Sequence, residues 1–382
     1  MIKKIKIYIT LAAVAFSSVS CLDKYPEDAI PEGDAIRTVE EANQAVIGIY
    51  AYMKNPNLYS GLLTLFPDLQ ADLAYAVEGY TNTYGNIWRW DILPTNTEVE
   101  AVYGTLNALI GKCNFLLERI AVLEQEVDDE DYEKLQQFKG EALFARALSY
   151  SDLIKMYCKA YDPATAADEL GVVLVSSYSN AGTLKRASLK DSYQFVLDDL
   201  AQSATCLKPD ENENDESYYD TLYFTIYAVN ALYARVYLNM QEWDKAIEYA
   251  SKVIDSRKFK LSSTTEMIDS ETSYYQYMWQ YDHSTETIWK VGFTTTSYGG
   301  SLGQIFFNYD FNSFKPDYVP AEWVLNLYAD TDLRATTFFQ FYRTGYEHGL
   351  QWPLLAKYFG NQEFYEQNIL HVTMPKVFRL SE

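Results

Sequence analysis

One stretch of the sequence combines the side chains that suit a carbohydrate ligand. A sugar presents apolar C–H faces and rings of hydroxyl groups, so its binding site needs flat aromatic rings beside carboxylate, amide or guanidinium groups. The stretch 72–91 holds both kinds: Asp72, Tyr75, Tyr80, Asn82, Tyr84, Asn86, Trp88, Arg89, Trp90 and Asp91. It also contains two glycines and shows no clean period. We therefore expect a loop whose aromatic rings are not all needed for the core.

Trp88 and Trp90 are the strongest candidates within this stretch. Alternate residues of a β-strand lie on one face, so a strand here would present both indoles together. The competing interpretation is that the two rings pack in the core. The sequence alone leaves both open.

Two later aromatic clusters are weaker candidates. One surrounds Tyr275 and Trp279, and the other surrounds Tyr309. Alternating aromatic residues are typical of sheet packing, which favours a structural role for most of them.

Metal and cofactor chemistry finds no support in the sequence. The three histidines stand far apart, without the spacing of a zinc site. The run 210–215 is similar to the start of a calcium loop, but Asp215 stands where that loop needs glycine and Thr221 where it needs glutamate. A solvated acidic loop is favoured, and we expect neither a metal nor a cofactor.

Composition limits the partners further. The chain has 382 residues, 48% of them hydrophobic, and a formal net charge of -22. Such a composition excludes global disorder, and the negative charge would repel phosphates, so we expect no nucleic acid as partner. The same charge predicts a neutral rather than a polyanionic glycan.

The N-terminus indicates export. Lys3, Lys4 and Lys6 precede a short apolar run, and small residues then lead to Cys21. This pattern predicts a signal peptide over 1–20, lipidation at Cys21 and a tether over 21–37, so that a lipid anchors the protein to the membrane. A simple secreted protein with an incidental cysteine is the alternative.

The elements that must position these residues are mainly helices. Helical periodicity and start signals recur over 38–257, with capping boxes expected at Thr38 and Thr95. The word Ala-Leu-Phe-Ala-Arg at 142–146 returns as Ala-Leu-Tyr-Ala-Arg at 231–235. The second copy has the spacing of a tetratricopeptide helix pair, although two unrelated alanine-rich helices would also explain the repeat. We expect a mainly α fold of irregular tetratricopeptide-like helix pairs with long loops and a few short strands.

The remaining part, 258–382, has a different character. Thr, Ser, Tyr and Gly become frequent, and short strands are predicted at 286–293 and 371–380. The last two residues are similar to the opening of a helix, so we expect the reading frame to continue past Glu382 and this C-terminal region to be incomplete.

Several short sequence motifs, in their order along the chain, carry a family resemblance. They are Gly-Glu-Ala-Leu-Phe-Ala-Arg-Ala at 140–147, then 171–175, Arg-Ala-Ser at 186–188, the pair 231–254, the strand 286–291 and the end 374–382. Together with the lipoprotein signal, they resemble the SusD/RagB family of outer-membrane lipoproteins from polysaccharide-degrading Bacteroidetes-type bacteria.

This resemblance implies a function. Family members are non-catalytic, surface-exposed lipoproteins that bind oligosaccharides and act as a lid over a TonB-dependent outer-membrane transporter. It also implies that the loop at 72–91 and the later half contribute ligand contacts. The expected glycan-binding residues are Asp72, Tyr80, Tyr84, Trp88, Arg89, Trp90, Tyr275, Trp279 and Tyr309. A helical glycoside hydrolase and a scaffold that binds a protein partner remain as alternatives; among 53 acidic residues, no carboxylate pair is singled out.

Overall fold

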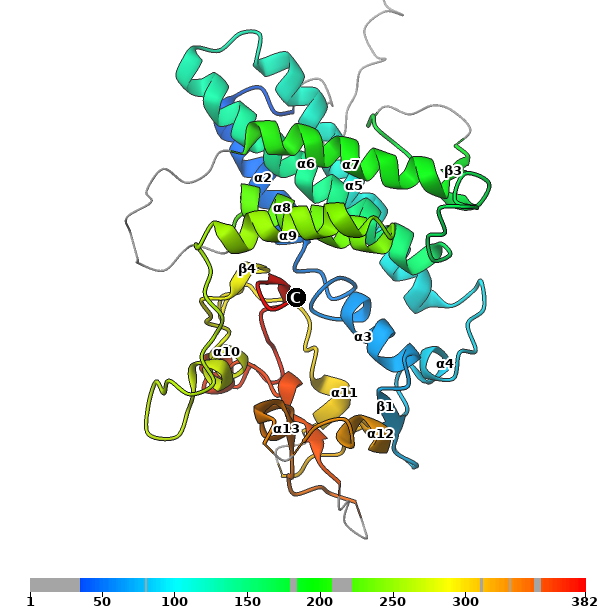
Figure 1. Cartoon of the computed structure of the whole chain (residues 1–382), viewed down its shortest axis with the longest axis vertical. Helices are drawn as coiled ribbons and strands as arrows, with labels where there is room; N and C mark the ends of the chain where they lie inside the picture. Colours follow the sequence, from blue (N-terminus) through cyan, green and yellow to red (C-terminus); the bar gives the residue numbers. More distant parts are fainter. Residues whose placement is uncertain are drawn as a thin grey trace, which may run out of the picture.

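The computed structural model describes residues 35–79, 81–178, 184–207, 222–309, 312–329, 331–346 and 352–382. Helices dominate them, and the strands form two-stranded antiparallel pairs. In Figure 1 the long helices form the upper part, and short helices, strands and loops form the lower part. The prediction of a mainly α fold is confirmed. Cys21, Tyr80 and the acidic run 210–215 lie outside the described residues.

Six long helices make the upper part. They are α2 (Val39–Tyr52), α5 (Thr97–Leu123), α6 (Asp129–Tyr157), α7 (Leu189–Cys206), α8 (Ile226–Asn239) and α9 (Trp243–Asp255). The capping box predicted at Thr38 is present, with Glu41 as its partner. The one predicted at Thr95 is wrong: the helix starts one residue later, because the Asn96 side chain accepts a hydrogen bond from the Val99 N–H.

The lower part contains short elements. The helices are α3 (Leu62–Gln70), α4 (Gly85–Trp88), α10 (Tyr274–Tyr281), α11 (Gln304–Phe307), α12 (Glu322–Leu325), α13 (Leu333–Phe338), η2 (Ala356–Tyr358) and α14 (Gln362–Tyr365). The strand pairs are β1 (Ala74–Ala76) with β5 (Tyr318–Pro320), β4 (Thr287–Lys290) with β8 (Lys376–Arg379), and β6 (Phe339–Gln340) with β7 (Leu354–Leu355). A further pair, β2 (Leu170–Val173) with β3 (Arg186–Ser188), lies against the long helices. The strands predicted at 286–293 and 371–380 are thus present, in shortened form.

The repeated word lies on two helices, as expected. The copy at 142–146 is on α6, which packs between α5 and α7, and the copy at 231–235 is on α8, which packs against α9. In the first copy every residue is buried, since two alanines about one helical turn apart, Ala142 and Ala145, let neighbouring helices approach closely.

Arg146, the last residue of the first copy, joins three helices. Its guanidinium donates to both carboxylate oxygens of Asp199 on α7, at 2.8 and 2.6 Å, and to the side-chain oxygen of Asn114 on α5, at 2.7 Å. All three side chains are buried. Each charge is therefore tolerated only because the other is present.

Arg146→Met should destabilise the protein by about 3–5 kcal/mol, because it leaves the Asp199 carboxylate buried without its partner. The double variant Arg146→Met/Asp199→Leu removes both charges and should recover a large part of that loss. Urea unfolding followed by circular dichroism measures both. Equal stability of the single and double variants would contradict this account of the pair.

A buried histidine lies in the lower part. The ring of His371 stacks on Phe307, with centroids 5.1 Å apart, and its Nδ1 lies 3.0 Å from the Phe359 carbonyl oxygen. The neutral ring therefore donates from Nδ1, and the buried Nε2 has no hydrogen-bond partner among the described residues. Burial lowers the pKa of His371, since a second ring proton would bring charge into an apolar site.

The free energy of unfolding should therefore fall as the pH drops through about 6.5, the ordinary pKa of histidine in an unfolded chain. The sign follows because the unfolded chain then takes up a proton that the folded state excludes. His371→Phe should flatten this part of the profile between pH 7.5 and 5.5 in denaturant titrations. Parallel profiles for the variant and the parent chain would refute the assignment.

Candidate functional site

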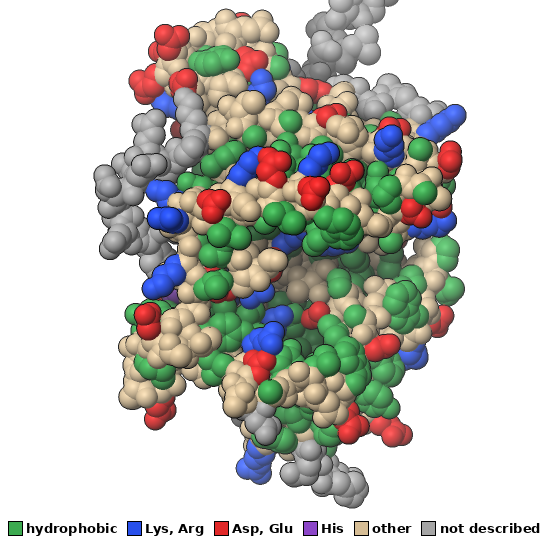
Figure 2. All heavy atoms as spheres, viewed as in Figure 1, with side chains coloured by type: hydrophobic (Ala, Val, Ile, Leu, Met, Phe, Trp, Pro, Cys, Tyr) green, Lys and Arg blue, Asp and Glu red, His purple; other side chains and the backbone are tan. Residues whose placement is uncertain are grey.

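Aromatic side chains gather around the β1–β5 pair in the lower part of the molecule. Figure 1 shows β1 beside α4 and α12, and Figure 2 shows hydrophobic side chains gathered over the lower part of this face. Tyr75 and Trp90 are each 63% exposed and Trp323 is 47% exposed, while Trp88 and Trp352 are half-buried. We call these five rings the aromatic platform.

Each indole of the platform is anchored by its N–H. Every one donates to a main-chain carbonyl oxygen: Trp88 to Ala74 at 2.9 Å, Trp90 to Gln70 at 3.0 Å, Trp323 to Asp72 at 3.1 Å and Trp352 to Pro320 at 2.8 Å. The polar edge of each ring is thus satisfied by the protein, and little side-chain freedom is left to lose on binding. Exposed rings that are fixed in this way can stack against a flat apolar surface of a ligand.

Trp88 and Trp90 do not lie on a strand, which was the arrangement that would have placed both indoles on one face. Trp88 ends the short helix α4, and Trp90 has a left-handed backbone with φ 58°. Tyr84 precedes this helix, also in the left-handed region, and a side chain at Gly85 would collide with Asn82. This tight turn replaces the strand, so the two indoles do not share a strand face.

The two tryptophans consequently differ in exposure. The ring of Trp88 packs edge-on against Tyr75, with centroids 5.8 Å apart and planes at 80°. It also contacts Tyr318 of β5. Trp88 therefore supports the platform, and Trp90 offers the larger free surface.

Polar candidates lie beside the platform. Tyr84 and Arg89 line a cavity of about 180 Å³ with Asn82, Asn86 and Glu98 among its other walls. Arg89 donates to the side-chain oxygen of Asn86 at 2.9 Å. Burial, with the nearby Glu98 carboxylate, raises the pKa of Tyr84, so its phenol stays a hydrogen-bond donor at neutral pH. Asp72 contributes its carbonyl to Trp323 and keeps its side chain exposed.

A groove of about 430 Å³ runs beside β1. Tyr75 and Trp352 form aromatic walls, and Val319 and Pro320 of β5 close it. Its lining carries the carboxylates of Glu78 and Glu322 and no lysine or arginine. Such a groove combines apolar contact with hydrogen-bond acceptors, which suits hydroxyl groups and disfavours anions.

The later candidates are not part of this platform. Tyr275 and Trp279 lie on helix α10 instead of the expected strand, and Trp279 packs against Phe338. Tyr309 packs on Phe314, with centroids 4.8 Å apart. None of the three, Tyr275, Trp279 or Tyr309, lines the groove or the polar cavity. Tyr84 and Arg89 thus share the polar cavity, and Trp88 and Trp90 are hydrogen-bonded to the backbone within and just before β1, whereas the later candidates pack against other residues.

Sequence reasoning missed Trp323 and Trp352. Both reach the platform from the later half of the chain, through the antiparallel pairing of Tyr75 with Val319. The available signal was their residue type: the chain has seven tryptophans, and four of them lie in this platform. The pairing that brings them here is not encoded locally.

Two further properties bear on the site. In the described ranges, no cluster of three or more histidine, cysteine or acidic side chains is arranged to hold a metal ion. Likewise, none of the helices within those ranges has the length and apolar character needed to cross a membrane.

Comparison with known proteins identifies the family. Residues 21–238 match the SusD-like family, whose description is starch-binding associating with outer membrane. The chain belongs to this SusD-like family. Among curated proteins, SusD-like protein P25 of Formosa agariphila is 22% identical over 316 residues, which are 79% of this chain and 54% of that protein. SusD-like protein P2 of the same organism is 23% identical over 66% of this chain and 46% of its own length. The chain thus spans about half the length of these curated relatives.

Solved structures share the fold of this SusD-like chain. A SusD superfamily protein from Bacteroides thetaiotaomicron matches with a TM-score of 0.75 and 22% identity, over 90% of this chain and 74% of its own. A putative sugar binding protein from Bacteroides vulgatus matches with a TM-score of 0.72 and 23% identity, over 91% and 72%. Surface glycan-binding protein A from Bacteroides uniformis matches with a TM-score of 0.67 and 16% identity, over 90% and 74%.

Proposed function

We propose that this protein is a non-catalytic glycan-binding lipoprotein of the outer membrane. It captures oligosaccharides at the cell surface on the aromatic platform and passes them to a TonB-dependent transporter. The observation that carries the proposal is Trp90, whose ring is 63% exposed while its N–H is held by the Gln70 carbonyl. Membership of a family described as starch-binding supports the same reading.

The ligand that fits the platform is a neutral oligosaccharide. Tyr75, Trp90 and Trp323 stack against the C–H faces of sugar rings, and this stacking supplies affinity. Glu78 and Glu322 in the groove, with Tyr84 and Arg89 beside it, exchange hydrogen bonds with hydroxyl groups and supply specificity. The two groove carboxylates repel an anionic ligand at this place.

Trp90→Ala should weaken oligosaccharide binding by about 1 kcal/mol or more, roughly fivefold in Kd, because it removes an exposed stacking surface. Isothermal titration calorimetry against a panel of neutral oligosaccharides measures this, with Trp90→Phe retaining part of the affinity. Chromatography of each glycan after long incubation tests the hydrolase alternative, which requires shortened products.

The matched control is Trp243→Ala. Trp243 is 56% exposed at the start of α9, in the upper part of the molecule, so its loss likewise removes one exposed indole but leaves the platform intact (Figure 1). Its affinity should equal that of the parent chain. Equal affinities of the Trp90→Ala variant and the parent for every glycan that binds would exclude Trp90 from the site.

Cys21→Ser should release the protein from the membrane fraction of an expressing Bacteroides-type cell, because a single lipid is the proposed anchor. Fractionation followed by immunoblotting measures this, and protease treatment of intact cells tests surface exposure. Crosslinking in the native membrane tests the transporter partner. A Cys21→Ser protein that stays in the membrane fraction would contradict the lipid anchor.

A further inference from the structure

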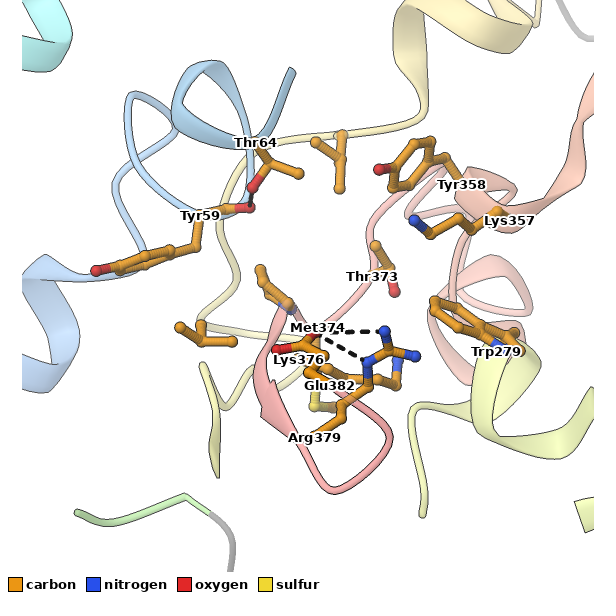
Figure 3. Close-up of a pocket in the computed structure, with 13 residues that line it drawn as sticks. Tyr59, Thr64, Trp279, Lys357, Tyr358, Thr373, Met374, Lys376, Arg379 and Glu382 are labelled. Carbon is orange, nitrogen blue, oxygen red and sulfur yellow. Dashed lines mark hydrogen bonds and ion pairs between the residues drawn. The ribbon is translucent and has the colours of Figure 1, made fainter. Parts of the chain in front are cut away.

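A second pocket lies between α10, η2 and the end of β8, apart from the platform. Figure 3 shows its walls, with Trp279 beside Lys357 and Arg379. Its volume is about 220 Å³, and it shares no lining residue with the groove beside β1 or with the polar cavity at Tyr84. It is thus separate from the site proposed above.

Three cationic groups surround one indole in this pocket. The Lys357 ammonium lies 5.4 Å, the Lys376 ammonium 5.3 Å and the Arg379 guanidinium 5.2 Å from the centre of the Trp279 ring. An aromatic face attracts each of them, but it carries no net charge and does not neutralise three positive groups. In a chain with a net charge of -22, such a concentration of cations is a local exception.

Two of the three cationic groups have carboxylate partners within the chain. Lys376 pairs with the buried Asp282 at 2.5 Å. Burial alone would raise the pKa of Asp282, but Lys376 and the hydrogen bonds of the surrounding chain hold that pKa below its ordinary value, so the pair stays ionised. Arg379 lies 3.3 Å from Glu382 and 3.8 Å from Glu286.

Lys357 has no such partner. Its contacts are with aromatic rings: besides Trp279, it lies over Tyr358 at 5.0 Å and over Phe338 at 5.7 Å. Among the described residues, no carboxylate comes within ion-pair distance of its ammonium group, and the nearby Asp68 accepts a hydrogen bond from the Tyr358 hydroxyl at 2.8 Å. Burial lowers the pKa of Lys357, and the positive charges of Arg379 and Lys376 act in the same direction, while the carboxylates of Asp68 and Glu382 act against them. An ammonium group in these surroundings, without an ion-pair partner among the described residues, gains from an anionic ligand.

We propose that this pocket binds a carboxylate carried on a single sugar ring, with Lys357 and Arg379 as its two cationic contacts. The pocket, of about 220 Å³, admits one sugar ring, and its walls combine apolar side chains with Thr64 and Thr373. Their hydroxyl groups donate to the Tyr59 carbonyl and the Asp282 carboxylate and can still accept a hydrogen bond from a ligand. A uronic acid has this chemistry: an anionic group on a mostly neutral, hydroxyl-rich body. The chain would then recognise two kinds of sugar at two places, a neutral one on the platform and an acidic one here.

The test uses a matched pair of ligands, methyl glucuronide and methyl glucoside, which differ only in carrying a carboxylate or a hydroxymethyl group. Calorimetry with the full chain at low salt should show binding of the glucuronide to this pocket and at least about tenfold weaker binding of the glucoside there. Lys357→Met should weaken glucuronide binding about tenfold or more. Sodium sulfate serves as the probe for an anion without a sugar ring, and it should bind more weakly than the glucuronide.

Two controls separate this pocket from other effects. Lys245→Met removes another lysine that lies over a tyrosine ring, 5.1 Å from the centre of Tyr237, outside the pocket, and should leave glucuronide binding unchanged. Trp90→Ala should also leave it unchanged, which distinguishes failure of this pocket from failure of the platform. Thermal unfolding checks that Lys357→Met is folded: glucuronide should raise the melting temperature of the parent chain and not that of the variant. Equal glucuronide binding by Lys357→Met and the parent, equal binding of glucuronide and glucoside, or sulfate binding as tight as glucuronide would overturn the proposal.

Discussion

The hydrogen bond from an indole N–H to a main-chain carbonyl is the interaction on which the proposed site depends. A tryptophan with most of its ring in water has few packing contacts to fix its orientation, so a polar anchor must do so. Four such anchors attach Trp88, Trp90, Trp323 and Trp352 to the backbone around β1 and β5. Ala74 and Pro320 lie on the paired strands β1 and β5, and Gln70 ends helix α3, so three of the four acceptors belong to regular secondary structure that restrains the rings.

The long helices connect the two segments that form this surface, which lie far apart in the sequence. The β1–β5 ladder joins residues 74–76 to residues 318–320, and the segment between them contains α5 to α9. Buried polar links such as Arg146 with Asp199 fix the helices relative to one another. In the lower part, Asp282 accepts hydrogen bonds from Asn361, Thr373 and the Met374 N–H, which ties α10 to the segment before β8. The pocket at Trp279 depends on that link in the same way as the platform depends on the ladder.

Local signals in the sequence were sufficient for most of the long helices and insufficient for the site. Thr38 with Glu41 could be recognised because a helix start uses residues close together in sequence. The shared face that a strand would give Trp88 and Trp90 does not form, because the backbone is left-handed at Tyr84 and Trp90, and periodicity does not reveal such turns. Trp323 and Trp352 were missed for another reason: their place is set by a long-range pairing. Residue composition correctly indicated an aromatic cluster at 72–91, but not which rings would be free.

The most direct measurement of the central claim is a nuclear magnetic resonance titration of the indole signals with a neutral oligosaccharide that calorimetry has shown to bind. The seven tryptophans give separate signals that can be assigned by single substitutions. The account predicts shifts at the ring signals of Trp90 and Trp323, with Trp289 unchanged because it is fully buried in the core. Shifts confined to Trp243 or Trp279, with Trp90 and Trp323 unaffected, would show that the glycan lies elsewhere and that the platform is not the binding surface.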